Sequence, residues 1–431
     1  MKIKKTGSVL ETLIGIPPFW RAQESDWKIT VVRTSLERLG YQVIYPYLSL
    51  FIIALGAQKS QLGLITSLGI LIGGLLGPVT GNFIDKNGAK KVYVVGILML
   101  LASYLLYATA GSWYVCIAAM IIYYLGNGTA IHSCGTICGN CLKNCDRAKG
   151  MLICESLAAG LLGMVGPMIA AFVLVRLVGA DEASPSADSM RWLFYLSAFF
   201  TVISLVLVVT KLSNQKWAVK NRMGNHPVRE GMAILKSNKN ARKWIFIAAC
   251  SNLPQAMILP FVQVYASEVK GADVTTLATM VTACSLTSVL CGFATGSLAD
   301  RFGRKKVMYV LMPLFWCSCL LLVVAKSPFF LILAGILEGF YYINSPLSAA
   351  IQRELVSQEV MGTWLGVTRL TNAVVSAVMA LLSGIIYDRV GPQYVFLIFV
   401  AVDVLVRLPL LISLPETLHL EKPEAELYEE K

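Results

Sequence analysis

Long apolar stretches separated by short polar segments occupy most of the chain. Twelve of them can be delimited, at roughly 30–56, 61–84, 91–110, 113–138, 150–176, 191–211, 244–267, 274–298, 306–325, 328–351, 362–386 and 391–413. Each is long enough to cross about 30 Å of hydrocarbon as an α-helix, which satisfies its own backbone hydrogen bonds there. The pattern predicts an all-α membrane protein with twelve transmembrane helices.

The composition supports this prediction. Of the 431 residues, 56% are hydrophobic and only 14% are charged, whereas about a quarter of the residues in a typical soluble domain are charged. The chain therefore has too little polar surface to cover itself in water, and a soluble globular protein is excluded.

The net charge of +12 follows the predicted topology. If the N-terminus is cytoplasmic, 27 of the Lys and Arg residues fall in inner segments and 6 in outer loops, and the rest lie within spans. This positive-inside bias predicts a plasma-membrane protein with both termini in the cytoplasm. It also explains the basic charge without a nucleic-acid partner.

An internal repeat divides the chain into two halves. The segments "GNFIDKNGAKKV" (81–92) and "GSLADRFGRKKV" (296–307) are offset by 215 residues, and "PYLSLF" from Pro46 and "PFVQVY" from Pro260 are offset by 214. The predicted organisation is a cytoplasmic or interfacial segment (1–28), a six-helix bundle (29–211), a cytoplasmic linker (212–243), a second six-helix bundle (244–414) and a cytoplasmic tail (415–431). Parallel repeats of this kind place a shared site at their interface near the membrane midplane.

The two repeated loops resemble the signature of the major facilitator superfamily between its second and third helices, and the echo of that signature between the eighth and ninth. The resemblance covers about residues 29–415 and implies two pseudo-symmetric bundles that work by alternating access. It also implies that the loops latch the halves in one state, although a tight charged turn that only sets topology is the plainer interpretation. The gating residues expected from these loops are Gly81, Asp85, Lys86, Gly88, Lys90, Lys91, Gly296, Asp300, Arg301, Gly303, Lys305 and Lys306.

Two further positions are expected to take part in gating. Gly166 and Pro167 in the fifth span look like the antiporter motif of efflux branches of the family, although a kinked and closely packed helix explains them equally well. Arg369 in the eleventh span is the expected partner of Asp85. The fourth span, however, lacks the arginine that drug–proton antiporters usually carry there.

Glu338 is the strongest candidate for coupling transport to protons. It lies about ten residues into the tenth span, or roughly 15 Å along a helix, which places it near the midplane. An ionisable residue in hydrocarbon is a functional hypothesis by default, and burial favours its neutral form. The alternative is a carboxyl group tied to Tyr or Ser hydroxyls across the bundle.

The resemblance implies that the first, fourth, seventh and tenth helices line the central cavity. These spans carry aromatic and amide side chains that, as a set, suit an amphipathic and perhaps cationic organic molecule. Taken singly, each is more often a packing residue than a ligand-binding one. The predicted cavity residues are Tyr41, Gln42, Tyr45, Tyr123, Tyr124, Asn127, Asn252, Gln255, Gln263, Tyr341, Tyr342 and Asn344.

Four cysteines, Cys134, Cys138, Cys141 and Cys145, form one stripe on a helix. They cannot close a tetrahedral four-cysteine site, because the first and last lie about 16 Å apart along the axis. Two of them with a ligand from elsewhere could hold a soft metal. Cysteine is also a small, readily buried apolar residue, so the favoured interpretation is a packing face with no metal and no cofactor.

No nucleotide-binding loop, nucleophile elbow or paired-carboxylate spacing is present, so an enzyme is not expected. The sequence predicts a monomeric secondary transporter whose partners are a small-molecule substrate, protons and the lipid bilayer. Proton-coupled efflux of an amphipathic or cationic compound is favoured. The alternatives are uptake or exchange of a small polar metabolite, transport of a soft metal or arsenical, and a transporter-like sensor.

Overall fold

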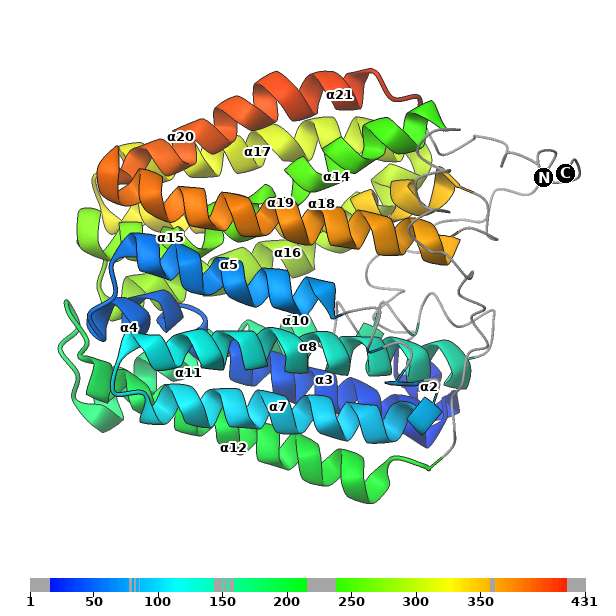
Figure 1. The fold of residues 1–431 in the computed structure, drawn as a ribbon, viewed down its shortest axis with the longest axis horizontal. Helices are drawn as coiled ribbons and strands as arrows, with labels where there is room; N and C mark the ends of the chain where they lie inside the picture. Colours follow the sequence, from blue (N-terminus) through cyan, green and yellow to red (C-terminus); the bar gives the residue numbers. More distant parts are fainter. Residues whose placement is uncertain are drawn as a thin grey trace, which may run out of the picture.

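The computed structural model describes residues 16–76, 80, 83–84, 86–142, 150, 153–154, 159–214, 238–356 and 361–416. Within these ranges the chain is helical and contains no β-strand. Long helices lie side by side with their axes along one common direction (Figure 1). The predicted all-α fold is confirmed.

Two groups of helices follow each other along the chain. The first comprises α2 (Ile16–Ala22), α3 (Ser25–Ile44), α4 (Leu48–Ala54), α5 (Lys59–Leu75), α7 (Ala89–Thr109), α8 (Trp113–Cys141), α10 (Ala159–Gly163), α11 (Gly166–Phe172), the π-helical turn η2 (Val173–Val178) and α12 (Ala187–Lys211). The second comprises α14 (Lys239–Met257), α15 (Leu259–Val264), η3 (Tyr265–Val269), α16 (Val274–Phe302), α17 (Arg304–Val324), α18 (Pro328–Glu354), α19 (Met361–Arg389), α20 (Pro392–Val402), η4 (Asp403–Arg407) and α21 (Leu408–Ile412).

Ten helical segments of the described chain are long and apolar enough to cross a membrane. The two other predicted spans correspond to α3 with α4 and to α5. Helix α3 carries several charged residues and is separated from α4 by a turn at Tyr45–Tyr47, and α5 is apolar but has 17 residues. Neither is among the ten segments, so the predicted count of twelve transmembrane helices is confirmed for ten of them within the described residues.

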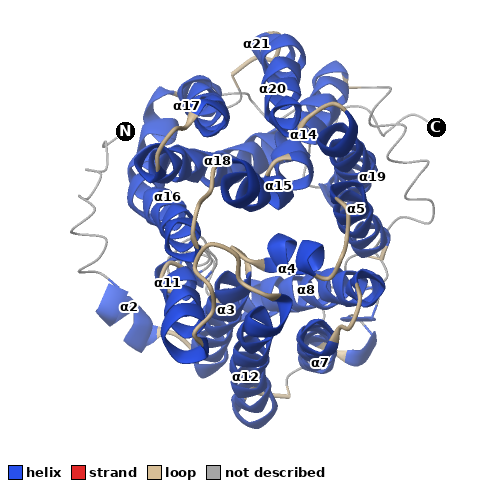
Figure 2. Cartoon of the chain, turned by 90° about the vertical axis from the view of Figure 1, so that its left-hand side faces the viewer, coloured by secondary structure: helices blue, strands red, loops and turns tan. Residues whose placement is uncertain are grey.

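The two halves meet along α5 and α19 and along α11 and α16, as the view along the helix axes shows (Figure 2). Glycines allow α5 and α19 to approach closely. A Cβ atom on Gly63 would lie 2.5 Å from the Ala380 carbonyl oxygen, and one on Gly384 would lie 2.5 Å from that of Lys59. Small residues at crossing points let helix backbones come together where lipid offers no hydrophobic driving force.

One end of the bundle holds α2, the start of α14 and the end of α21, and is called the terminal end here; the opposite end is the far end (Figure 1). At the far end several polar contacts join the two halves. The Tyr47 hydroxyl donates to the Val274 carbonyl at 2.8 Å, and Lys59 pairs with Glu268 at 2.9 Å. The Ser60 amide donates to an Asp388 carboxylate oxygen at 2.7 Å. The far end is thus closed by contacts between the halves.

Replacing Gly384 by Ala should destabilise the protein by about 1–3 kcal/mol, because the new methyl group overlaps the backbone of α5. Gly366 on the same helix α19 is the matched control, since a Cβ atom there meets nothing within 4 Å. Gly366→Ala should leave stability unchanged or raise it slightly through helix propensity. Thermal unfolding of the purified variants measures both effects, and equal melting temperatures would contradict the close packing.

Candidate functional site

The first membrane-crossing helix of each half is broken at an equivalent place. The break between α3 and α4 contains Pro46, and the break between α14 and α15 lies at Ile258, with Pro254 before it and Pro260 after it. Proline removes a backbone donor and so frees a carbonyl of the preceding turn. The far-end pieces α4 and α15 pack against each other across the two halves. Discontinuous helices of this kind flank the binding site in transporters with internal repeats.

Six predicted cavity tyrosines form a row across the interface between the halves, called the tyrosine row here. Tyr41 stacks on Tyr123 with ring centroids 5.6 Å apart and also contacts Tyr45 at 5.5 Å. Tyr342 lies within electrostatic reach of Tyr45. The remaining two members are Tyr124, next to Tyr123, and Tyr341, next to Tyr342. All six side chains are half-buried, so their ring faces are only partly covered by the protein.

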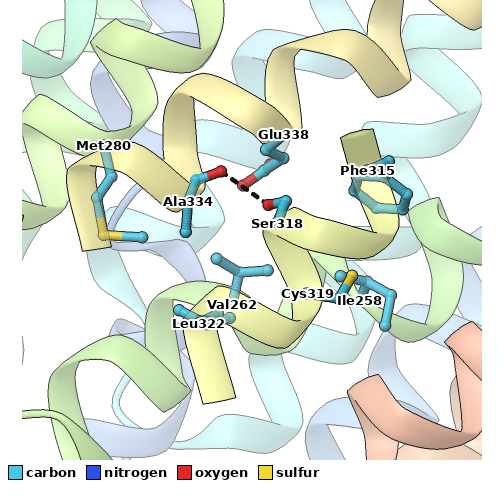
Figure 3. A pocket seen from close by; sticks show the side chains of 9 residues that line it. All are labelled: Ile258, Val262, Met280, Phe315, Ser318, Cys319, Leu322, Ala334 and Glu338. Atoms are coloured by element: carbon cyan, nitrogen blue, oxygen red, sulfur yellow. Dashed lines mark hydrogen bonds between the residues drawn. The ribbon is translucent and has the colours of Figure 1, made fainter. Parts of the chain in front are cut away.

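Glu338 lies beside this row on α18, one helical turn from Tyr342. Only 6% of its surface is exposed, and it lies within electrostatic reach of Tyr45 and Tyr342. Its carboxylate points into a small cavity of the C-terminal half, with room for about one water molecule (Figure 3). The cavity is lined by Ile258, Val262, Met280, Phe315, Ser318, Cys319, Leu322, Ala334 and Glu338.

The carboxylate of Glu338 has no hydrogen-bond or ion-pair partner among the residues that the structure describes. The nearest candidate donor, the Ser318 hydroxyl, donates instead to the Ala334 carbonyl at 2.7 Å (Figure 3). Burying an ionised carboxylate without a partner costs free energy. Binding of a proton or a cation to such a group lowers this cost. The described structure therefore contains no Ser or Tyr hydroxyl bond that ties Glu338 in place.

The predicted amides fall into two groups. The Gln42 side-chain amide donates to the Ser285 hydroxyl across the interface at 3.3 Å, but its Oε1 is buried without a partner, as are Oε1 of Gln263 and Oδ1 of Asn344. Buried acceptors of this kind carry the full desolvation penalty unless a ligand or water donates to them. The other amides lack this property: Asn252 donates to the Ala248 carbonyl, Gln255 is exposed and Asn127 is half-buried.

The repeated loops share their geometry in the two halves. Gly88 and Gly303 have φ angles of 85° and 105°, in a region that side-chain-bearing residues rarely adopt. Two residues after each glycine, a lysine binds carbonyls at the end of its half's last helix. Lys90 donates to Leu212 at 2.5 Å beyond α12, and Lys305 donates to Ile412 at 2.9 Å in α21. Each lysine thus caps a helix C-terminus, where cations are favoured.

The model of the Major Facilitator Superfamily matches residues 34–254 and 244–429. This chain belongs to that superfamily. Proteins of two Staphylococcus aureus strains, COL and N315, each named "Putative proline/betaine transporter", are 23% identical over 252 residues, which is 56% of this chain and 52% of each relative. The chain spans about half the length of these curated relatives.

Solved transporters share the fold over nearly their whole length. The nucleoside transporter NupG aligns with a TM-score of 0.71 at 16% identity, over 90% of this chain and 98% of that one. A POT family transporter in complex with 5-aminolevulinic acid aligns with a TM-score of 0.72 at 13% identity, over 90% and 96% of the two chains. The major facilitator fold and the multi-pass membrane class are thus confirmed.

The structure describes the side chains of only some of the remaining gating residues expected for a major facilitator protein. Gly81 and Asp85 lie outside the described residues, and Gly296 and Asp300 are described only as backbone of α16. Lys86, Lys91, Arg301 and Lys306 are exposed. The Arg369 guanidinium lies 3.3 Å from the His132 imidazole on α8, and its predicted pairing with Asp85 stays a prediction.

Gly166 lies at the break between α10 and α11, against α3. A Cβ atom there would lie 2.8 Å from the Gln42 Cβ and 3.0 Å from the Leu39 carbonyl oxygen. Pro167 follows in the first turn of α11, where proline is well tolerated. Gly166 thus allows the fifth span to pack closely on the first, and an antiport role of Gly166 and Pro167 stays a prediction.

Some residues at the site escaped the sequence prediction. Ser285 lies on the eighth span and Phe315 and Ser318 on the ninth, outside the four helices expected to line the cavity. His132 on α8 lies beside Arg369 on α19. The apolar pattern of these spans did not predict that Ser285 and Ser318 lie at the site. A single hydroxyl in a helix interior commonly bonds a backbone carbonyl of the same helix, so its presence does not indicate a site.

Replacing Lys90 or Lys305 by Met should lower stability by about 1–2 kcal/mol, because each change removes a charged donor from a helix C-terminus. Lys91→Met and Lys306→Met are matched controls, since these neighbouring lysines are exposed and each control removes the same charge from the same loop. Thermal unfolding in one detergent compares the four variants. Equal losses in capping and control variants would refute the capping role.

Proposed function

We propose that the protein is a secondary transporter that carries a small organic solute with a positively charged nitrogen across the plasma membrane by alternating access. The tyrosine row receives the charged group, and Glu338 couples its movement to protons. The single observation that carries this proposal is an unpaired, buried carboxylate one turn from a row of partly open tyrosine rings.

Ring faces attract cations through their negative quadrupole, by about 0.5–2 kcal/mol for each good contact. The Arg38 guanidinium lies 5.8 Å from the ring centroid of Tyr41, a contact that supports a cation-binding role for this ring. A betaine contains a quaternary ammonium group, so the name of the Staphylococcus aureus relatives agrees with such a substrate. The family assignment also favours transport over enzymatic activity.

The contacts between the halves suit one state of an alternating-access cycle. Polar contacts of Tyr47, Lys59 and Ser60 close the far end. The distribution of Lys and Arg predicts that the terminal end is cytoplasmic. With that orientation these contacts support an inward-facing state, and we propose that they break when the far end opens while α5 and α19 remain a shared hinge surface.

Glu338 can couple substrate binding to proton binding, because either one lowers the free-energy cost of burying its charged carboxylate. The ionised carboxylate attracts a cation in the tyrosine row, whereas the protonated carboxyl no longer does. Substrate and proton then compete for one site, which is the requirement for exchange of one for the other. The same site serves efflux or uptake.

A second candidate is transport of an uncharged polar metabolite. The buried unpaired oxygens of Gln42, Gln263 and Asn344 favour it, because acceptors of this kind are satisfied by the hydroxyl or amide donors of an uncharged substrate. Such a substrate would depend on these amides more than on ring faces.

Glu338→Gln should abolish transport driven by a pH gradient in proteoliposomes and leave substrate exchange without a gradient measurable, with a weaker affinity for the substrate because the neutral amide does not attract the cation. Glutamine keeps the shape of the side chain but cannot release a proton. Asp188→Asn on α12 is the matched control, because that carboxylate is exposed and pairs with Arg191 of the same helix, away from the contacts between the halves. Gradient-driven transport that survives in Glu338→Gln would remove this residue from the coupling mechanism.

Tyr41→Leu should weaken binding of betaine by about 2- to 30-fold, as expected for the loss of one cation–π contact, while Tyr41→Phe should bind almost normally. Isothermal titration of the purified variants with betaine, and with proline as a second solute, measures the effect. If the Phe and Leu variants lose affinity equally, the ring face is not the recognition element, and the hydroxyl-dependent, uncharged candidate is favoured.

A further inference from the structure

Three cysteine thiols from two segments of the N-terminal half converge in its interior. Cys134 and Cys138 lie one turn apart on α8, and Cys154 reaches them from the next described segment, so that all three Sγ atoms lie within 4.8 Å of one another. Their exposures are 6%, 2% and 0%, and all three are free thiols. These residues are called the thiol cluster here.

The spacing of the thiol cluster matches that of ligands around one ion. Three sulfurs bound to one ion at about 2.3 Å lie about 3.4–4.0 Å apart, from pyramidal to trigonal geometry. The Sγ atoms of Cys134 and Cys154 are already 4.0 Å apart, and all three lie within 4.8 Å of one another. The separations therefore need to shorten by about 1 Å, which side-chain rotation can supply.

The coordination number of the cluster selects the kind of ion. No fourth His, Cys, Asp or Glu joins the group among the described residues. Cys141, the next member of the helix stripe, instead donates to the Ile137 carbonyl at 2.6 Å. Zn²⁺ favours four ligands, whereas trivalent arsenic and Cu⁺ are satisfied by three sulfurs.

Charge distinguishes these two ions. Arg33 lies within electrostatic reach of Cys134, but its charge is already paired with Glu37 at 3.2 Å and lies over the Tyr93 ring. Three thiolates around Cu⁺ would leave two negative charges in a buried site with little compensation, which is costly. Three thiolates around trivalent arsenic give a neutral complex.

We propose that Cys134, Cys138 and Cys154 form a binding site for trivalent arsenic, separate from the tyrosine row. Binding of arsenous acid replaces its three As–O bonds by three As–S bonds; the three thiol protons leave with the three hydroxyl groups as water. No oxidation or reduction takes place. The bound arsenic ties α8 to the segment around Cys154 and stabilises the N-terminal half.

The test uses the full-length protein, purified and fully reduced, with sodium arsenite as the probe. The wild type should retain one arsenic per chain after desalting, and arsenite should raise its melting temperature, since a ligand that binds only the folded state stabilises it. Cys134→Ser, Cys138→Ser and Cys154→Ser should each weaken binding at least about tenfold. Cys141→Ser and Cys116→Ser are matched controls, because both are buried cysteines outside the cluster, and they should bind normally.

X-ray absorption of the arsenite-loaded wild type keeps the test decisive where a serine variant fails to fold. The proposal expects arsenic bonded to three sulfurs and no oxygen. Arsenic with oxygen neighbours, undiminished binding in folded Cys154→Ser, or equal loss in Cys141→Ser would overturn it. Tight Cu⁺ binding in competition with a chelator, without arsenite binding, would overturn the assignment to a trivalent ion.

Discussion

The structure depends on one constraint, that a chain segment in hydrocarbon must satisfy its own polar groups. Regular helices meet it along most of the chain, and irregular backbone is tolerated at membrane depth only where protein or a water-filled cavity surrounds it. The breaks at Tyr45–Tyr47 and at Ile258 obey this rule, since Tyr47 and Ile258 are almost fully buried. The same places that interrupt the helices therefore face the interface between the halves. That position makes them suitable for a binding site.

The duplicated loops show how the same constraint shapes the helix ends. At the terminal end the last carbonyls of α12 and α21 have no partners within their helices. A lysine at the same position of each loop supplies the missing donor, and a glycine two residues earlier makes the sharp turn that brings it there. These loops therefore hold the third and sixth helices of each half together. A loop anchored in this way can move only with its whole bundle, which suits rigid-body motion between the halves.

The sequence predicted the fold class and the repeat because both arise from patterns that a single chain displays. Apolar length identifies spans, and a 215-residue offset identifies a duplication. The six tyrosines expected in the cavity lie in one row and come from helices one, four and ten; their role as cavity residues stays a prediction. The partners of individual side chains could not be predicted in this way. The Ser318 hydroxyl donates to the Ala334 carbonyl rather than to Glu338. The Sγ atom of Cys154 lies 4.0 Å from that of Cys134, although the two residues are 20 positions apart in the sequence. Such choices depend on helix rotation, which apolar periodicity specifies poorly when every face of a helix is apolar.

The two halves share the same arrangement of helices but carry different side chains at one pair of equivalent positions beside the tyrosine row. Glu338 on α18 corresponds, by the 215-residue offset, to Tyr123 on α8. Tyr123 stacks on Tyr41 within the row, whereas Glu338 lies one turn behind the row in the C-terminal half. If both positions carried carboxylates, their repulsion would act in every state of the cycle. A ring on one side and a carboxylate on the other place an attractive surface opposite a single titratable charge. Symmetric motion of the bundles can then change the surroundings of that one charge, which agrees with the proposed coupling of substrate and proton at Glu338.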